Sequence, residues 1–391
     1  ARRTALRDQH AGSGAGSLLA AWTLLPSLGF ARASWLLGSA VCLVAFAQGS
    51  GRVRAPVAAA AAASLAVAIG TTSSVGRDRV QGMDDLNVQQ ILAYDESADS
   101  TVAVIEAGDG VRRLVIDGFV ATSELSKHAA YMAWMGRLPM LLHADPRQVL
   151  VIAFGTGQTA NGTREPGLER LDIVDISRSV LSMAPLFERN EGVLDDPRVH
   201  ARVMDGRAWV RRTNRRYDVV TLEPMPPYFA GMNALYSREF YELVATRLAE
   251  GGIAVQWLPV HLLPRVHCAS VVGTFAQVFP DSILWVDPTG GTAILLGRLP
   301  GSDPPLGEAW PGIARSADST LGLSEQTIRG AVVLGPEAMA AYGRRGRVIT
   351  DDNQLLAYGR VLQQMWRKPP IRLGLANHAS IREVAVAHPR R

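Results

Sequence analysis

The stretch QVLVIAFGTGQTA, Gln148–Ala160, decides the fold. Its first seven residues are almost wholly apolar, and Gly155 and Gly157 follow them directly. A short apolar run bounded by glycine is typical of a strand that is buried on both faces of a parallel sheet. Glycines after such a strand let the backbone approach a ligand where a side chain would collide. The stretch therefore predicts a strand that leads into a nucleoside- or phosphate-binding loop.

Further apolar runs repeat this pattern along the chain. They are RLDIVDI (170–176), HARVMD (200–205), YDVVTLE (217–223) and GIAVQWL (252–258). Helical stretches such as 237–252 separate them, with apolar residues three and four positions apart and a glycine stop. Two last runs, 282–287 and 291–298, flank the turn PTGG and predict an antiparallel hairpin at one sheet edge. Strands that alternate with helices predict an α/β, doubly wound, Rossmann-like sheet over residues 123–300.

The regions on either side of this sheet have simpler patterns. Residues 81–122 predict a small N-terminal β-unit, because β-branched residues alternate in 100–108 and 112–118 around the turn GDGV. A helix over 123–143 should follow, with Tyr131 toward one face. Residues 301–391 predict a helical extension and a basic, proline-punctuated tail that we expect to be peripheral.

Residues 1–80 differ in composition from the rest of the chain. Three apolar stretches, 15–30, 33–48 and 55–70, contain no acidic residue and alternate with arginines. Each is slightly shorter than the roughly 20 residues that span a bilayer, and flanking small residues can extend them. Length and charge placement favour about three transmembrane helices over buried helices of a soluble protein. A cleaved signal peptide would supply one such stretch rather than three.

The overall composition argues against a nucleic-acid partner and against a metal site. The 40 basic and 36 acidic residues give a net charge of +4, and the arginines are scattered rather than clustered in a basic patch. Two cysteines, Cys42 and Cys268, provide no disulfide framework. His261, His267 and Cys268 match no standard zinc spacing, so we expect no metal.

Acidic residues end three of the predicted strands, where ligands of such sheets bind. Asp175 comes about twenty residues after the glycine loop, and its carboxylate can accept both ribose hydroxyls. Asp205 can accept from an adenine amino group, and Glu223 ends the next strand. Three such acids suit an adenosine with a positively charged reacting group better than a pyrophosphate. The alternative is that these acids are solvated or cap the following helices.

Residues 91 to about 298 resemble the spermidine synthase family, the polyamine aminopropyltransferases. The segments that carry the resemblance include ILAYDESADSTVAVIE, QVLVIAFGTGQTA, DPRVHARVMDGRAWV and YDVVTLEPMPPYFAGMNALYSREFYELV. The chain is most similar to the bacterial branch in which this domain follows membrane helices. The resemblance implies a class I methyltransferase-like sheet and transfer of an aminopropyl group from decarboxylated S-adenosylmethionine to an amine such as putrescine.

The resemblance also implies roles for individual residues, and the chemistry agrees. An alkylamine titrates near pH 10 like lysine, so a carboxylate must accept its proton before the nitrogen can attack the carbon next to the sulfonium. By motif position the residues are as follows: Glu223 as the catalytic acid; Asp175 at the ribose; Asp205 and Gly206 at the adenine; Gly155, Thr156 and Gly157 in the co-substrate loop; Tyr131 and Tyr228 at the amine.

Four positions depart from the typical family pattern. Pro226 stands where the motif D-[ST]-[ST]-D-P has a second acid that helps to hold the amine. Thr156 replaces a loop aspartate that binds the donor amine, and Ser100 and Ala121 replace two glutamines near the donor. Each lost charge-assisted hydrogen bond weakens binding by roughly 1.5 to 3 kcal/mol.

Three functions follow as alternatives. The first is a membrane-anchored aminopropyltransferase with Glu223 as general base, located in the bacterial inner membrane with its catalytic domain in the cytoplasm. The second is a non-catalytic, spermidine synthase-like subunit of a membrane complex, which the four departures favour. The third is a methyltransferase that uses S-adenosylmethionine itself, which Thr156 favours because an aspartate there would repel the carboxylate of that donor. Expected partners are a nucleoside, an amine, membrane lipid, and a second copy or a membrane-complex subunit.

Overall fold

The structure is a computed structural model, and it describes residues 16, 19–49, 51–70, 80–83, 86–97, 99–301, 304–313, 321–357 and 370–389 of the 391-residue chain. The chain forms two compact units, Ala1–Ser123 and Glu124–Arg391. Each unit has its own secondary structure and is treated by itself.

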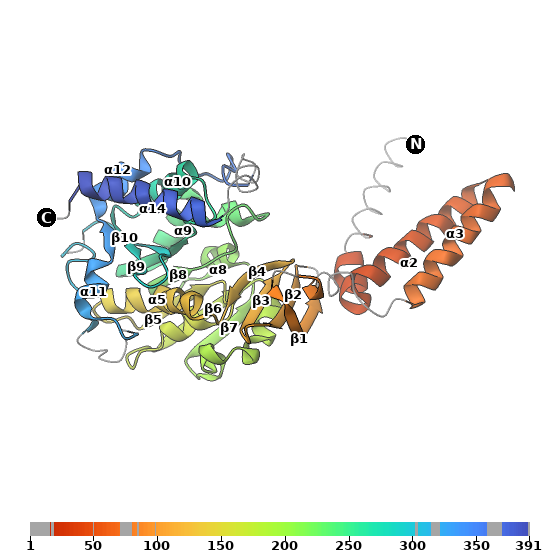
Figure 1. The fold of residues 1–391 in the computed structure, drawn as a ribbon, viewed down its shortest axis with the longest axis horizontal. Coiled ribbons are helices and arrows are strands. Elements are labelled where there is room, and N and C mark those ends of the chain that lie inside the picture. The colour runs from red at the N-terminus through yellow and green to blue at the C-terminus, as the bar shows by residue number, and fades with distance from the viewer. Residues whose placement is uncertain are drawn as a thin grey trace. The chain divides into compact units, whose positions relative to one another are not determined.

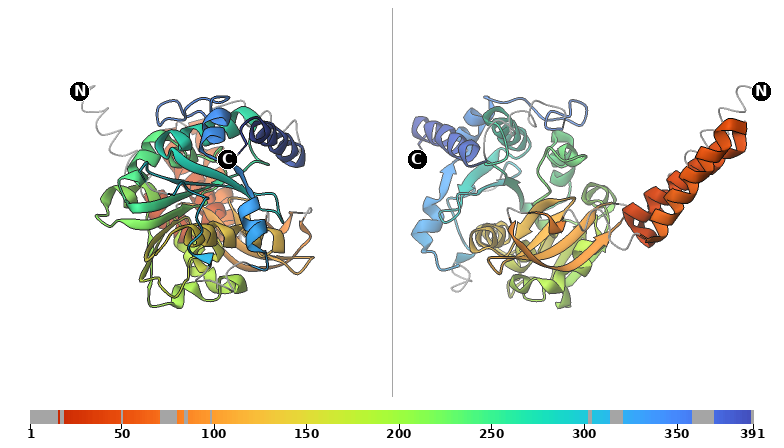
Figure 2. Two further views of the ribbon diagram at one scale, coloured as in Figure 1. Left: turned by 90° about the vertical axis from the view of Figure 1, so that its left-hand side faces the viewer. Right: turned by 45° about the vertical axis from the view of Figure 1, so that its right-hand side comes forward.

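The first unit begins with a pair of helices. A π-helical turn, η1 (Ala20–Leu24), runs directly into α2 (Leu25–Gln48), and α3 (Gly51–Gly70) lies beside α2 (Figure 2). Gly29 has a φ of 75° and breaks the helical path, so α2 consists of two helical parts that meet at a kink. Residues 15, 17 and 18 of the first stretch lie outside the described residues.

One helical stretch of the described chain, Ser27–Gln48, is long and apolar enough to cross a membrane, whereas three were expected. Arg54–Gly70 is apolar but shorter. The candidate span corresponds to the second expected stretch, because the kink at Gly29 interrupts the first, and the third is shorter and contains Pro56.

A four-stranded antiparallel sheet completes the first unit. Its strands follow one another in chain order: β1 (Val88–Glu96), β2 (Thr101–Ala107), β3 (Arg112–Ile116) and β4 (Phe119–Ser123). The β2–β3 pair is the predicted hairpin, and β1 and β4 extend it on either side. Buried Val80, Ala103, Ile105 and Val115 form its small core.

The second unit contains an eight-stranded sheet in the order β12-β10-β11-β9-β8-β5-β6-β7. Strands β5 to β9 are parallel, and β10, β11 and β12 are antiparallel at one edge, as a doubly wound fold with a closing hairpin requires. The bounds are β5 (Gln148–Ile152), β6 (Arg170–Asp175), β7 (Val199–Val203), β8 (Tyr217–Leu222), β9 (Leu248–Leu258), β10 (Asp281–Val286), β11 (Ala293–Arg298) and β12 (Val332–Leu334).

Helices cover both faces of this sheet. Leu150, Ile152, Val220 and Leu222 face one side, where their core cluster includes residues of α8 (Gly206–Arg212), α9 (Arg238–Ala245) and α10 (Arg265–Val278). Thr221 points to the opposite side, and its hydroxyl donates to a backbone carbonyl of α5 (Ser126–Leu142) at 3.2 Å. The shorter helices are α6 (Gln158–Gly162), α7 (Arg178–Ser182), η3 (Ala184–Leu186), η4 (Glu188–Asn190), η5 (Val193–Asp195) and η6 (Met232–Leu235).

The helix predicted over 237–252 ends early. Helix α9 stops at Ala245, and β9 begins at Leu248 because that residue pairs with Tyr217 of β8. Sheet pairing therefore overrides the local helical pattern in the last turn.

The C-terminal region belongs to the core, and the peripheral position expected for its basic tail is wrong where that tail forms a buried helix. It contributes α11 (Glu325–Gly330), β12, α12 (Pro336–Gly343) and α14 (Pro370–Ala387). Helices α10, α12 and α14 lie together (Figure 1). The physical reason is burial, since Leu334, Met339, Ile349, Leu356 and Ile381 are at most 1% exposed within the main cluster. Residues 358–369 and the last two of the tail lie outside the described residues.

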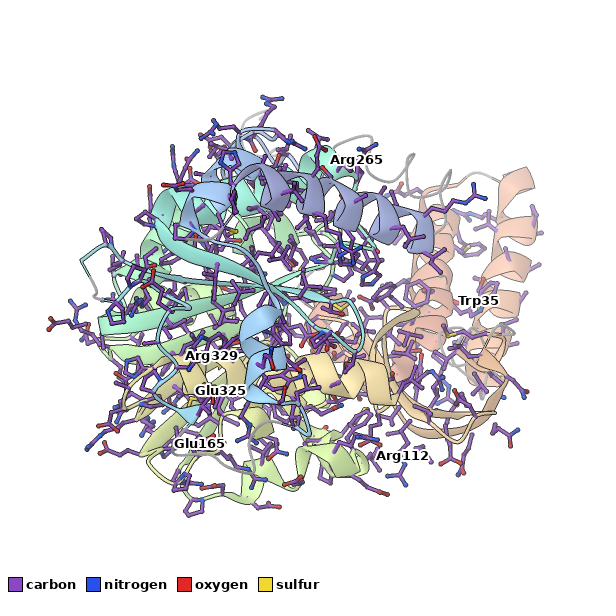
Figure 3. The ribbon with its side chains drawn as sticks, turned by 60° about the vertical axis from the view of Figure 1, so that its left-hand side comes forward. Trp35, Arg112, Glu165, Arg265, Glu325 and Arg329 are labelled. Atoms are coloured by element: carbon purple, nitrogen blue, oxygen red, sulfur yellow. The ribbon has the colours of Figure 1, made fainter. Side chains whose placement is uncertain are left out.

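Ion pairs hold this C-terminal region in place. Arg207 of α8 donates to Asp351 Oδ1 at 2.6 Å and to the carbonyl of Ala234 at 3.0 Å. The Ser237 hydroxyl donates to the same Asp351 oxygen at 2.7 Å. On α11, Glu325 and Arg329 lie one turn apart and form an ion pair of 2.6 Å (Figure 3).

Candidate active site

The loop after β5 requires unusual backbone angles. Ala153, Gly155 and Gly157 have φ values of 68°, 56° and 84°. A Cβ on Gly157 would lie 2.6 Å from the ring of Phe154, so glycine is needed there for both reasons. Ala153 holds a left-handed conformation that costs a residue with a side chain about 1 kcal/mol. Such local strain, in a loop at the carboxyl edge of a parallel sheet, is typical of a functional site.

Glu223 directly follows β8 and meets Tyr131 of α5. The Tyr131 hydroxyl donates to Glu223 Oε1 at 2.6 Å, although the two residues are 92 positions apart. Helix α5 packs on β8 and β9, which explains the meeting. On the other oxygen, Thr159 Oγ1 of α6 lies 3.3 Å from Glu223 Oε2 and 3.1 Å from the carbonyl of Met132. The single hydroxyl proton of Thr159 can therefore serve either acceptor.

The surroundings of Glu223 set its pKa near neutrality. Burial raises the pKa of this carboxyl to about 7, against the hydrogen bonds from Tyr131 and Thr159, which lower it. Burial and the adjacent Glu223 charge raise the pKa of Tyr131 well above its ordinary value, so the phenol stays protonated and donates. A carboxyl that is about half ionised at neutral pH can accept a proton and release it again.

Two further aromatic residues belong to the site, and the sequence analysis missed both. The ring of Trp257, at the end of β9, lies 6.4 Å from the Tyr131 ring with the planes 11° apart. Trp257 is 6% exposed, and its indole nitrogen has no hydrogen-bond partner in the part of the chain described. Tyr236 is fully buried, and burial, Tyr241 and the Glu223 charge raise its pKa. The rule that ligand-binding residues follow the carboxyl ends of parallel strands finds Trp257 when it is applied to aromatic residues.

Asp175 fixes the glycine loop to the end of β6. Its Oδ2 accepts from the Phe154 backbone N–H at 2.8 Å, and its Oδ1 accepts from the Ser177 N–H at 2.8 Å. The residue is 8% exposed. This acid therefore joins two neighbouring strand ends, beside Gly155.

Asp205 and Gly206 follow β7 and begin α8. Asp205 Oδ1 accepts from the Ala208 N–H at 2.7 Å, which is the helix-capping role weighed as the alternative for strand-end acids. The aspartate is nevertheless exposed. A Cβ on Gly206 would lie 2.3 Å from Ile152 Cγ2, so only glycine allows α8 to approach β5 this closely.

The remaining predicted residues lie near the loops without contacting Glu223 directly. Thr156 is 1% exposed, and its hydroxyl accepts from Gln158 Nε2 at 2.9 Å. Tyr228 is half-buried in the segment after Glu223, with its ring 5.3 Å from that of Phe229. Burial raises the pKa of Tyr228 to about 12. Across the described ranges, no group of three His, Cys, Asp or Glu side chains is arranged to hold a metal ion.

Comparisons with known proteins find similar sequences over the part of the chain that carries this site. Residues 128–286 match the model of the spermine/spermidine synthase domain. The chain is 32% identical over 199 residues to a polyamine aminopropyltransferase of Nitrosomonas europaea, covering 50% of this chain and 59% of that protein. It is 35% identical over 197 residues to polyamine aminopropyltransferase 2 of Hyperthermus butylicus, covering 49% and 64%.

A solved structure shows the same fold. A spermidine synthase crystallised in complex with the transition-state analogue AdoDATO superimposes with a TM-score of 0.56 at 20% identity, covering 66% of this chain and 90% of that one. The chain spans less than two thirds of the curated relatives named above. Sequence and fold nevertheless agree over the sheet that carries Glu223, and the chain is similar to the spermine/spermidine synthase domain over residues 128–286.

Proposed function

We propose that this chain is an aminopropyltransferase that moves an aminopropyl group from decarboxylated S-adenosylmethionine to an amine. The observation that carries the proposal is Glu223, a partly buried carboxyl with a pKa of about 7 at the carboxyl end of a parallel strand. The matches to polyamine aminopropyltransferases support the reaction class. The spermidine synthase that holds AdoDATO supports a nucleoside donor.

The reaction needs one proton transfer and one displacement. Glu223 accepts a proton from the ammonium of the acceptor, which frees the nitrogen lone pair. The nitrogen attacks the carbon next to the sulfonium, so a C–N bond forms while the C–S bond breaks and its electron pair returns to sulfur. Methylthioadenosine leaves as a neutral thioether. Tyr131 holds Oε1, and Thr159 can turn to the Met132 carbonyl, which leaves Oε2 to the amine.

The loops beside Glu223 are proposed to hold the donor. We propose that the backbone of Gly155, Thr156 and Gly157 approaches the donor and that Asp175, which fixes this loop, binds the ribose. Asp205 uses Oδ1 for the helix cap and offers its exposed side to the adenine, next to Gly206.

The first two helices are proposed to anchor the enzyme in the bacterial inner membrane with its catalytic domain in the cytoplasm. Support comes from the apolar stretch Ser27–Gln48 and from the absence of acidic residues in α2 and α3. Carbonate extraction of membranes followed by protease protection tests both parts of this proposal. Release of the full chain by carbonate would contradict anchoring.

Product analysis tests the reaction. The full chain, purified in detergent, is incubated with decarboxylated S-adenosylmethionine and a panel of amines, and methylthioadenosine is measured by chromatography. We expect it to form only when an amine is present. Donor binding in calorimetry without methylthioadenosine from any amine would refute the enzyme and favour the non-catalytic subunit.

A second candidate is a methyltransferase that uses S-adenosylmethionine itself. Thr156 favours it, because this buried neutral hydroxyl would not repel the carboxylate of the intact donor. Calorimetry with the two nucleosides separates the candidates. Tighter binding of the decarboxylated form excludes the methyltransferase.

A further inference from the structure

We infer that the acceptor is a monoamine, with one ionisable nitrogen and an apolar body, rather than a diamine or polyamine. This inference rests on the proposed function and names the substrate class of the same site. The observation behind it is that, among the described residues at this edge of the sheet in the second unit, Glu223 is the available carboxylate and it lies beside aromatic rings.

The other acids at this edge of the sheet are already occupied or distant. Asp175 is 8% exposed, and each of its oxygens accepts a backbone N–H. Asp205 caps α8 with Oδ1. In the strand order, β6 and β7 are the second and third neighbours of β8, which corresponds to about 10 and 14 Å. Of the three acids at these strand ends in the second unit, Glu223 is thus the one placed to meet the acceptor.

The charge balance around Glu223 agrees with this count. Burial raises the pKa of Glu223, two hydrogen bonds lower it, and no second ionised group of the described residues contributes. The pKa shifts of Tyr131 and Tyr236 likewise include Glu223 as the one carboxylate that acts on them. A second ammonium entering this site would therefore lose its water without gaining a counter-charge.

The groups that surround Glu223 suit a hydrocarbon chain. Tyr131, Tyr236 and Trp257 are at most 7% exposed, and Pro224 and Pro226 are buried directly after the carboxylate. The backbone carbonyl of Pro226 accepts from the Phe229 N–H at 2.9 Å, so this proline belongs to a tight turn. A buried ring therefore stands three residues after Glu223, where this turn offers no second carboxylate. Burial of methylene groups against such surfaces is favourable in free energy, whereas burial of an unpaired ammonium is unfavourable.

A matched pair of acceptors tests the inference. n-Butylamine and 1,4-diaminobutane have the same four-carbon chain and differ in the second amino group. With decarboxylated S-adenosylmethionine and the full chain in detergent, we expect kcat/KM to be about 10 to 100 times higher for n-butylamine, the range that one charge-assisted contact covers. Equal values, or a preference for 1,4-diaminobutane, would overturn the inference.

A binding measurement separates this inference from the proposed function. Calorimetry measures the affinity of each amine for the protein, alone and saturated with methylthioadenosine, where no transfer takes place. Tighter binding of n-butylamine supports the inference whether or not turnover occurs. Absent turnover with both amines contradicts the proposed function alone, and tighter binding of 1,4-diaminobutane contradicts the acceptor class alone.

Two substitutions at one position provide a matched control. Pro226→Asp adds a carboxylate beside Glu223, and Pro226→Asn adds a side chain of the same size without charge. We expect Pro226→Asp, relative to Pro226→Asn, to shift the affinity ratio toward 1,4-diaminobutane by about tenfold or more. The same ratio in both variants would count against the inference. Circular dichroism and methylthioadenosine binding verify that both variants fold. If either variant does not fold, the affinities of the wild-type chain for n-butylamine and 1,4-diaminobutane decide the question.

Discussion

Glu223 and Asp175 end two strands of one sheet at the same edge, yet they differ in the partners that they accept from. Asp175 accepts two backbone N–H groups, whose directions the fold fixes. Glu223 accepts from the hydroxyls of Tyr131 and Thr159, which can rotate. A carboxylate tied to backbone holds a loop in place, whereas one that meets side-chain hydroxyls in a buried setting remains able to exchange a proton. The partners, rather than the position at a strand end, distinguish the two roles.

The largest expected effect is on turnover. Glu223→Gln should lower the rate of methylthioadenosine formation by about 100- to 10,000-fold, because the amide cannot accept the ammonium proton. Donor affinity in calorimetry should stay within a few-fold of wild type. Glu242→Gln, at an exposed position on α9, is the matched control and should keep the wild-type rate. A Glu223→Gln rate within tenfold of wild type would assign the base to another group.

The same substitution should stabilise the protein above neutral pH. The folded pKa of Glu223, about 7, lies above the ordinary value of 4.5, so the folded state holds the proton more tightly and wild-type stability falls as pH rises between these values. Glu223→Gln removes this loss and should be more stable by up to about 3 kcal/mol above pH 7, with little difference below pH 4. Thermal melts at pH 4 and pH 8 measure it. If Glu223→Gln changed the melting temperature equally at pH 4 and pH 8, burial would not raise the pKa of this carboxyl.

Asp175→Asn should destabilise the protein, whereas Glu223→Gln stabilises it. The asparagine can accept only one of the two backbone N–H groups, from Phe154 or Ser177, and leaves the other unsatisfied in a buried place. We expect a loss of about 2 kcal/mol in the free energy of unfolding. This loss should appear as a melting temperature lower by several degrees, at both pH values. An unchanged melting temperature would mean that Asp175 does not fix the loop.

The smallest effect concerns the hydrogen bond to Glu223. Tyr131→Phe removes a donor that lowers the pKa of Glu223, so the rising limb of the pH–rate profile should move to higher pH by about one unit. Tyr342→Phe is a control at another buried tyrosine, on α12 and so on the opposite face of the sheet from α5, and should leave the profile in place. A shift toward lower pH in Tyr131→Phe would contradict the assigned hydrogen bond.

The sequence predicts the sheet well because most of its apolar runs end at a glycine or an acid. For this reason Asp175 and Glu223 were located at the strand ends where the structure has them. Thr159 and Trp257 could not be predicted in the same way, because they join the site through the packing of α5 against β8 and β9. The contacts of Tyr131 likewise depend on residues about 90 positions away.

The error over the C-terminal region has a different cause. Its apolar residues are spaced too irregularly to predict one strand or one long helix, and their burial depends on the open edge at β10 and on the uncovered side of α10. The local sequence pattern carries no information about which strand edge or helix face elsewhere in the chain still needs to be covered.

The ion pair between Arg207 and Asp351 bears on how the protein is made. The two residues are 144 positions apart, and Asp351 also receives the Ser237 hydroxyl next to the segment that follows Glu223. On the ribosome, this segment emerges long before its partners and must wait for residues 349–356 to be synthesised. Contacts of such sequence separation form slowly and expose apolar surface in the meantime. We therefore expect the nascent chain to bind chaperones between the synthesis of β9 and that of residues 349–356.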